Sequence, residues 1–154
     1  MTHRLMIISL VCVAGCGASA DPAQPFVGTW SYASGTNNVS CPNGNTAQKL
    51  TGNLTVKPAT EGGLVVLDPE GCNFSYALAG NDATLNGKNA CQFAVPELGQ
   101  GVTAAVTYDD ITLTTADGKT MTDTFAGKVS YTASNGTLDC AFSGTARLDK
   151  VSAQ

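Results

Sequence analysis

The sequence predicts an all-β protein: one antiparallel up-and-down meander of about eight strands that closes into a small barrel. From Phe26 onward the chain is rich in Thr, Val, Gly and Asn, and it shows no sustained 3.6-residue apolar period. Short stretches of alternating apolar and polar residues are separated by turn dipeptides such as Asp117-Gly118 and Asn135-Gly136. Closure would leave no edge strand exposed, and a β-sandwich is the alternative.

The strand boundaries follow from the two-residue alternation. The first strand is expected to place Phe26, Gly28, Trp30 and Tyr32 on one face, and a polar loop should hold Cys41-Pro42-Asn43-Gly44. In chain order, the expected strands cover residues 26–34, 49–57, 64–67, 72–79, 83–95, 102–108 with a continuation into 111–115, 121–131 and 138–148.

The dipeptide Asn135-Gly136 is the strongest hairpin signal in the chain. A turn centred on it places Tyr131 opposite Cys140 and Gly127 opposite Gly144. Both strands then present their apolar residues on the same face, which a one-residue slip would break.

Four cysteines follow the N-terminal region: Cys41, Cys72, Cys91 and Cys140. An even number of well-separated cysteines in an exported domain predicts two disulfides, whereas a structural zinc site usually has ligands two to four residues apart. A turn at Asn81-Asp82 would place Cys72 across from Cys91 and leave Cys41 for Cys140, which is the favoured pairing. A weak internal repeat around Cys72 and Cys140 suggests the alternative, Cys41–Cys72 with Cys91–Cys140.

The N-terminus has the two parts of an export signal: a short basic start and an apolar run over residues 5–14 that is too short to span a bilayer. It ends in Val13-Ala14-Gly15-Cys16, which resembles the lipobox of bacterial lipoproteins. The resemblance implies cleavage before Cys16, acylation of its thiol and anchoring in the membrane, and Gly17 favours the outer membrane. The alternative is an ordinary signal peptide that is cut after Ala18 or Ala20.

These features divide the chain into three parts: a lipoprotein signal peptide over residues 1–15, the lipidated cysteine and a short tether over 16–25, and the disulfide-bonded barrel domain over 26–151. Without Arg4, the eight basic side chains become seven, against twelve acidic ones, so the mature chain has a net charge of −5. This charge argues against nucleic acid as a partner, and it leaves membrane attachment to the acyl chains.

A second resemblance concerns the first strand. Gly28-Thr29-Trp30, which follows Phe26, is similar to the Gly-x-Trp opening of the calycin group, which includes the lipocalins, avidins and fatty-acid-binding proteins. The resemblance implies that Trp30 plugs the closed end of the barrel and that a ligand enters from the other end. Arg147 is the residue that could pack over Trp30, as an arginine does in many lipocalins.

Catalysis is not expected, and neither is a cofactor or a metal site. No histidine follows Cys16, and paired cysteines leave no thiol nucleophile. The carboxylate pairs Asp109-Asp110 and Asp68/Glu70 are interpreted as acids of surface turns, because adjacent strand residues point to opposite faces and turns favour Asp.

The inward-facing residues raise the question of a ligand cavity. The leading hypothesis for function is a lipocalin-like barrel that binds a small apolar ligand, and the alternative is a solid barrel that meets another envelope protein. Glycines such as Gly127 and Gly144 could leave a pocket, although aromatic side chains could equally fill the centre, and a filled barrel is favoured. The possible pocket lining is Trp30, Leu54, Phe74, Tyr76, Phe125 and Phe142.

Overall fold

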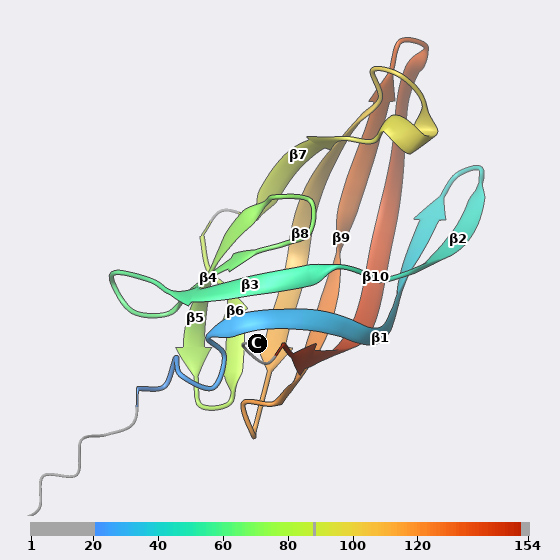
Figure 1. Cartoon of the computed structure of the whole chain (residues 1–154). Coiled ribbons are helices and arrows are strands. Elements are labelled where there is room, and N and C mark those ends of the chain that lie inside the picture. Colours follow the sequence, from blue (N-terminus) through green and yellow to red (C-terminus); the bar gives the residue numbers. More distant parts are fainter. Residues whose placement is uncertain (1–20, 88, 152–154) are drawn as a thin grey trace, which may run out of the picture.

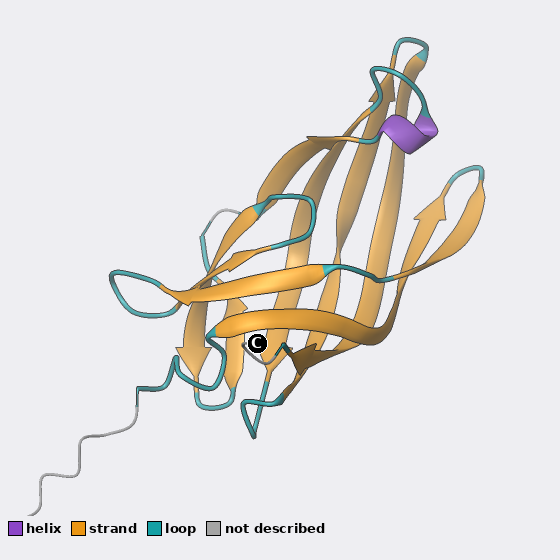
Figure 2. Cartoon of the chain, in the orientation of Figure 1, coloured by secondary structure: helices purple, strands orange, loops and turns teal. Residues whose placement is uncertain are grey.

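A computed structural model describes residues 21–87 and 89–151, and within this part of the chain ten strands form one antiparallel sheet (Figures 1 and 2). A short 3-10 helix, η1, follows the seventh strand. The elements are β1 (Gly28–Cys41), β2 (Gly44–Lys49), β3 (Asn53–Pro58), β4 (Leu64–Leu67), β5 (Asn73–Ala79), β6 (Asp82–Leu85), β7 (Ala90–Ala94), η1 (Pro96–Leu98), β8 (Thr103–Thr114), β9 (Thr120–Ala133) and β10 (Gly136–Lys150). The expected lipobox lies outside the described residues.

Eight of these strands close the barrel. They follow each other around the sheet in chain order, omitting β2 and β7, and β1 returns to pair with β10 from Trp30↔Lys150 to Ser40↔Ala141. The predicted eight-stranded meander and its closure are therefore confirmed, and the sandwich alternative is wrong. Closure gives β10 and β1 a hydrogen-bonded partner strand on each side.

The two additional strands widen the sheet at one end. β2 pairs with the second half of β1, so the segment around Cys41-Pro42-Asn43-Gly44, which was expected to be a loop, is a hairpin with Pro42-Asn43 at its turn. All six residues of β2 are exposed, and the strand therefore lacks the apolar alternation by which it could be predicted. The single strand expected over residues 83–95 is two strands, because β6 pairs with β5 and β8 whereas β7 pairs with β8 alone.

The closed end of the barrel is packed around Trp30, which is fully buried together with Phe26 and Leu148. The indole Nε1 of Trp30 donates a hydrogen bond to the carbonyl of Phe26 over 2.6 Å. Residues 21–26 form turns that bury Ala23, so this part of the expected tether packs against the barrel. Both ends of the described chain lie here, at the lower end in Figure 1.

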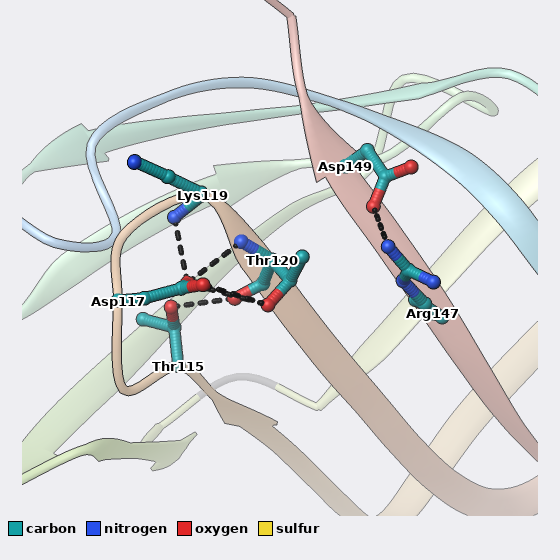
Figure 3. Close-up of polar contacts among 6 residues, drawn as sticks. All are labelled: Thr115, Asp117, Lys119, Thr120, Arg147 and Asp149. Carbon is teal, nitrogen blue, oxygen red and sulfur yellow. Dashed lines mark hydrogen bonds and ion pairs between the residues drawn. The ribbon is translucent and has the colours of Figure 1, made fainter.

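The role expected for Arg147 is wrong. Arg147 pairs with Asp149 over 3.0 Å, and its side chain is largely exposed (Figure 3). The cation over Trp30 is instead Lys150, whose Nζ lies 5.2 Å from the ring centroid. Arg147 occupies an outward position of β10, since its neighbours Ala146 and Leu148 are the buried ones.

The turn between β8 and β9 lies at this lower end (Figure 1), and Figure 3 shows its polar contacts. The Asp117 carboxylate accepts hydrogen bonds from the backbone N–H groups of Lys119 and Thr120, each over 2.8 Å. The Thr115 hydroxyl donates to the carbonyl of Thr120 over 2.6 Å. These side chains satisfy the backbone of the turn, as Asp and Thr commonly do.

The hairpin between β9 and β10 has the expected faces but a different register. Its turn residues are Ser134-Asn135, so Tyr131 lies opposite Leu138 and Cys140 lies opposite Val129. Gly136 has a φ of +140°, which L side chains rarely adopt, and it begins β10 instead of completing the turn. The partners are shifted by two residues, which leaves the inward-facing set unchanged.

The shifted register places each inward glycine opposite a phenylalanine. Gly127 pairs with Phe142 and Gly144 pairs with Phe125, so the two glycines do not face each other as expected. A Cβ at Gly127 would lie 2.7 Å from Cζ of Phe142, which shows that the phenyl ring covers the glycine backbone. The glycines thus accommodate rings, as glycines in strongly curved sheets often do.

Both predicted disulfides are present, with the favoured pairing: Cys41–Cys140 and Cys72–Cys91. The alternative derived from the internal repeat is wrong. The turn before β6 is nevertheless at Gly80-Asn81, since Ala79 pairs with Asp82. Cys72 and Cys91 are therefore not partners in one ladder, and their bridge joins β7 to the start of β5 with the two Cα atoms 6.0 Å apart.

Candidate ligand-binding cavity

A cavity of about 450 Å³ lies inside the barrel, above the closed end. Its deep wall consists of inward-facing side chains from both halves of the sheet, and its rim consists mainly of exposed residues of three segments. The exposed rim residues are Gln48 of β2, Thr51 between β2 and β3, Pro69 and Glu70 in the β4–β5 turn, Ala94 of β7, and Glu97 and Leu98 of η1; the half-buried Asp68, next to Pro69, also belongs to the rim. The expected filled barrel is therefore wrong. The volume is within the range of about 300–1,000 Å³ that is typical of small-molecule sites.

The floor of this cavity carries a buried acid, Asp123. On β9 every second residue points inward, and Asp123 is the next inward position after Met121, which belongs to the closed end. Only 2% of Asp123 is exposed, whereas acidic residues are almost never buried without a partner. The sheet fixes this orientation, because a strand residue between two outward-facing threonines has to point inward.

Asp123 has one hydrogen-bond partner for its two oxygens. The hydroxyl of Tyr32, from β1, donates to Oδ2 over 3.1 Å, while Oδ1 is buried with no partner in the described structure. Burial raises the pKa of the Asp123 carboxyl to about 7, although the hydrogen bond from Tyr32 lowers it. Near neutral pH the cavity floor therefore holds a carboxyl group that is close to half ionised.

Aromatic side chains surround this acid. Tyr76 and Tyr108 also line the cavity, and burial, with the charge of Asp123 as a further contribution, raises the pKa of both phenols above their usual range. The ring of Tyr108 makes edge-on contacts with Phe74 and Phe142, with centroids 5.1 and 5.3 Å apart. Edge-to-face packing of this kind holds rings in defined positions, so the wall is largely pre-formed.

The rim is acidic as well. Asp68, Glu70 and Glu97 line the cavity, and none of its described lining residues is a Lys, Arg or His. Asp68 accepts a hydrogen bond from the backbone N–H of Cys72 over 2.7 Å. Burial raises the pKa of Asp68 to about 6, against the lowering effect of that hydrogen bond. The cavity therefore combines an apolar wall with carboxyl groups at its floor and its mouth.

The structure brings together five of the six residues that were named as possible pocket lining. Leu54, Phe74, Tyr76, Phe125 and Phe142 contribute to the cavity wall, as do Cys72 and Cys91. Trp30 does not line it, because it lies in the closed end below the cavity floor. The turn acids Asp68 and Glu70 lie at the rim, whereas Asp109 and Asp110 are exposed at a bulge in β8.

Sequence reasoning overlooked Asp123. The alternation that places Phe125, Gly127 and Val129 inward also assigns Asp123 to the inward face. An acid at an inward position of an otherwise apolar strand was the signal that could have identified it.

A metal site finds no support in the described residues, where no group of three or more His, Cys, Asp or Glu side chains could hold an ion. Within the same residues, no helix is long and apolar enough to cross a membrane. The chemical groups that the cavity offers are thus hydrogen-bonding carboxyls, phenols and amides on an apolar background.

No protein-family model matches the chain, and no curated protein matches it. Among solved structures, it is similar to a protein of unknown function from the DUF3598 family of Nostoc punctiforme PCC 73102. The identity is 8% and the TM-score is 0.39; the match covers 82% of this chain and 48% of that chain. The chain thus spans about half the length of that structure.

Proposed function

We propose that this protein is a binding module for a small, largely apolar molecule, which occupies the barrel cavity. The observation that carries the proposal is the cavity itself: about 450 Å³ bounded by aromatic and aliphatic side chains of a closed, disulfide-bonded barrel. Binding without catalysis is proposed because the chain after Cys16 has no histidine and its four cysteines form disulfides.

The proposal includes membrane attachment at the cell envelope. Its support is the lipobox-like Val13-Ala14-Gly15-Cys16 after a short apolar run. Acyl chains on Cys16 would hold the barrel at the membrane surface, and Gly17 makes the outer membrane the proposed location. A barrel held there is well placed to receive an apolar molecule that has low solubility in water.

The binding proposal is tested with the fluorescent probe N-phenyl-1-naphthylamine and its displacement by decanol. We expect saturable fluorescence enhancement that decanol reverses. Val129→Phe places a ring in the cavity wall and should weaken the binding of both compounds about tenfold or more, in the manner of other steric blocks of apolar pockets.

The matched control is Lys128→Phe, which adds the same ring at the preceding, outward-facing position of β9. It should leave the affinity of both compounds unchanged. Equal effects of the two variants, or no saturable binding by the unmodified chain, would contradict the proposal. Circular dichroism of both variants establishes that the barrel has folded.

A further inference from the structure

The head group of the ligand can be inferred from the polar atoms of the cavity. This inference rests on the proposed function and concerns the same site. Asp123 lies at the deep end, and its Oδ1 is buried with no hydrogen-bond partner in the described structure. Oδ1 of Asn37, another residue of the cavity wall, is also buried and unpartnered. The amide oxygen of Asn37 is an acceptor, and so is Oδ1 of Asp123 when its carboxyl is ionised, so the missing partner is a donor.

The distribution of charge favours a cationic donor. Four carboxyl groups line the cavity, at the floor (Asp123) and at the rim (Asp68, Glu70 and Glu97), and no cationic side chain lines it among the described residues. A fatty acid would place a further negative charge in this acidic cavity. A protonated amine would instead neutralise one, and buried charges in proteins are normally paired.

We propose that the ligand is an amphiphilic amine, with an apolar body packed against the aromatic wall and an ammonium group bound to Asp123 at the cavity floor. The hydroxyl of Tyr32 fixes the Asp123 carboxyl through Oδ2, which leaves Oδ1 for the ammonium group. The four acids also favour the approach of a cation from the rim, since like-signed groups in a cleft concentrate the opposite charge.

The test compares three probes with the same alkyl chain, decylamine, decanol and decanoate, by calorimetric titration of the full chain at pH 7.5. At this pH the amine is a cation and the acid is an anion. We expect decylamine to bind at least about tenfold more tightly than decanol, as close charge pairs in interfaces do, and decanoate to bind most weakly.

Asp123→Asn keeps the shape of the side chain and removes its charge, so the preference for decylamine over decanol should disappear. Asp110→Asn, which changes an exposed acid on the outer face of β8, is the matched control and should retain the preference. A preference that persists in Asp123→Asn would overturn the assignment of the head-group site.

The unmodified chain provides a test that does not depend on the folding of a variant. Asp123 is faced by Tyr32 of β1, Tyr76 of β5 and Tyr108 of β8, and the acids Asp68, Glu70 and Glu97 lie toward the rim. Lowering the pH from 7.5 to 5.5 should weaken decylamine binding several-fold as Asp123 gains a proton, and it should leave decanol binding unchanged.

The possible failures can be distinguished. If decanol binds and decylamine binds no more tightly, or if decanoate binds best, the amine inference is overturned while the binding function stands. If no probe binds, both are overturned.

Discussion

Ionised Asp123 destabilises the ligand-free barrel. Its folded-state pKa of about 7 lies above the ordinary value of 3.8, so between these values the folded chain holds a proton that the unfolded chain has released. Linkage then requires the free energy of unfolding to rise as the pH falls from 8 toward 5. Asp68, whose pKa is raised to about 6, acts in the same direction.

Asp123→Asn should therefore make the ligand-free chain more stable at pH 8 and reduce the pH dependence between 5 and 8. A shift of about three pKa units sets an upper limit of about 4 kcal/mol on the effect. Urea unfolding at both pH values measures it, with Asp110→Asn as the exposed control. Equal pH dependence in the unmodified chain and in Asp123→Asn would show that the carboxyl is already ionised well below pH 7.

At the scale of single residues, the alternation of apolar and polar residues predicted which side chains point inward. It predicted less well whether an inward side chain fills the core or lines the cavity. It assigned Leu54, Phe74 and Phe142 to the inward face, and all three line the cavity. Whether these side chains fill the barrel or surround a space depends on the packing of rings against glycines such as Gly127. That packing is set by the pairing of strands far apart in the sequence, which no local pattern encodes.

At the scale of elements, strands with one buried face were predictable and strands without one were not. β4 has the predicted bounds, and β5 and β9 agree within one or two residues. β2 was overlooked because every one of its residues is exposed. Turn dipeptides indicated where hairpins occur, but their centres were misplaced, since Gly136 begins a strand and does not lie within the turn.

The position of strand β7 in the sheet depends on a disulfide more than the positions of the other strands do. It pairs with β8 over five residues and with no other strand in the described part of the chain. Cys72–Cys91 is its covalent connection across the cavity wall to the start of β5. Cys41–Cys140, in contrast, joins β1 and β10, which already share a long hydrogen-bonded ladder.

Replacing Cys72 and Cys91 by Ala should therefore increase amide hydrogen exchange in β7 selectively. It should also lower the free energy of unfolding by about 3 kcal/mol, as expected for a bridge between cysteines 19 residues apart. Replacing Cys41 and Cys140, 99 residues apart, should lower it by about 4–5 kcal/mol without a selective effect on β7. Hydrogen exchange and urea unfolding of both variants measure these effects. Exchange in β7 that matches β9 in both variants would contradict the role given to Cys72–Cys91.

At the scale of the whole molecule, closure explains how so small a chain can hold a cavity. The β1–β10 ladder and two disulfides fix the wall, so the interior need not be filled for the barrel to keep its shape. The closed end supplies the packed core, with Trp30, Phe26 and Leu148 fully buried, and the other end holds the cavity. Composition and alternation could predict the closure, whereas the division into core and cavity arises from packing.

If the proposed acylation is right, attachment of the protein to the membrane should depend entirely on Cys16. After the proposed cleavage before Cys16 the chain would carry a net charge of −5, so electrostatic attraction to anionic lipids could not hold it, and firm anchoring would need two or three acyl chains. Cys16→Ser should move the protein from the membrane fraction to the soluble fraction, and mass spectrometry should show the loss of the acyl groups. Extraction of the unmodified protein should require detergent and should not respond to salt. An unchanged distribution of Cys16→Ser would refute acylation as the anchor, whereas release of the unmodified protein by salt alone would identify a charged partner in the membrane.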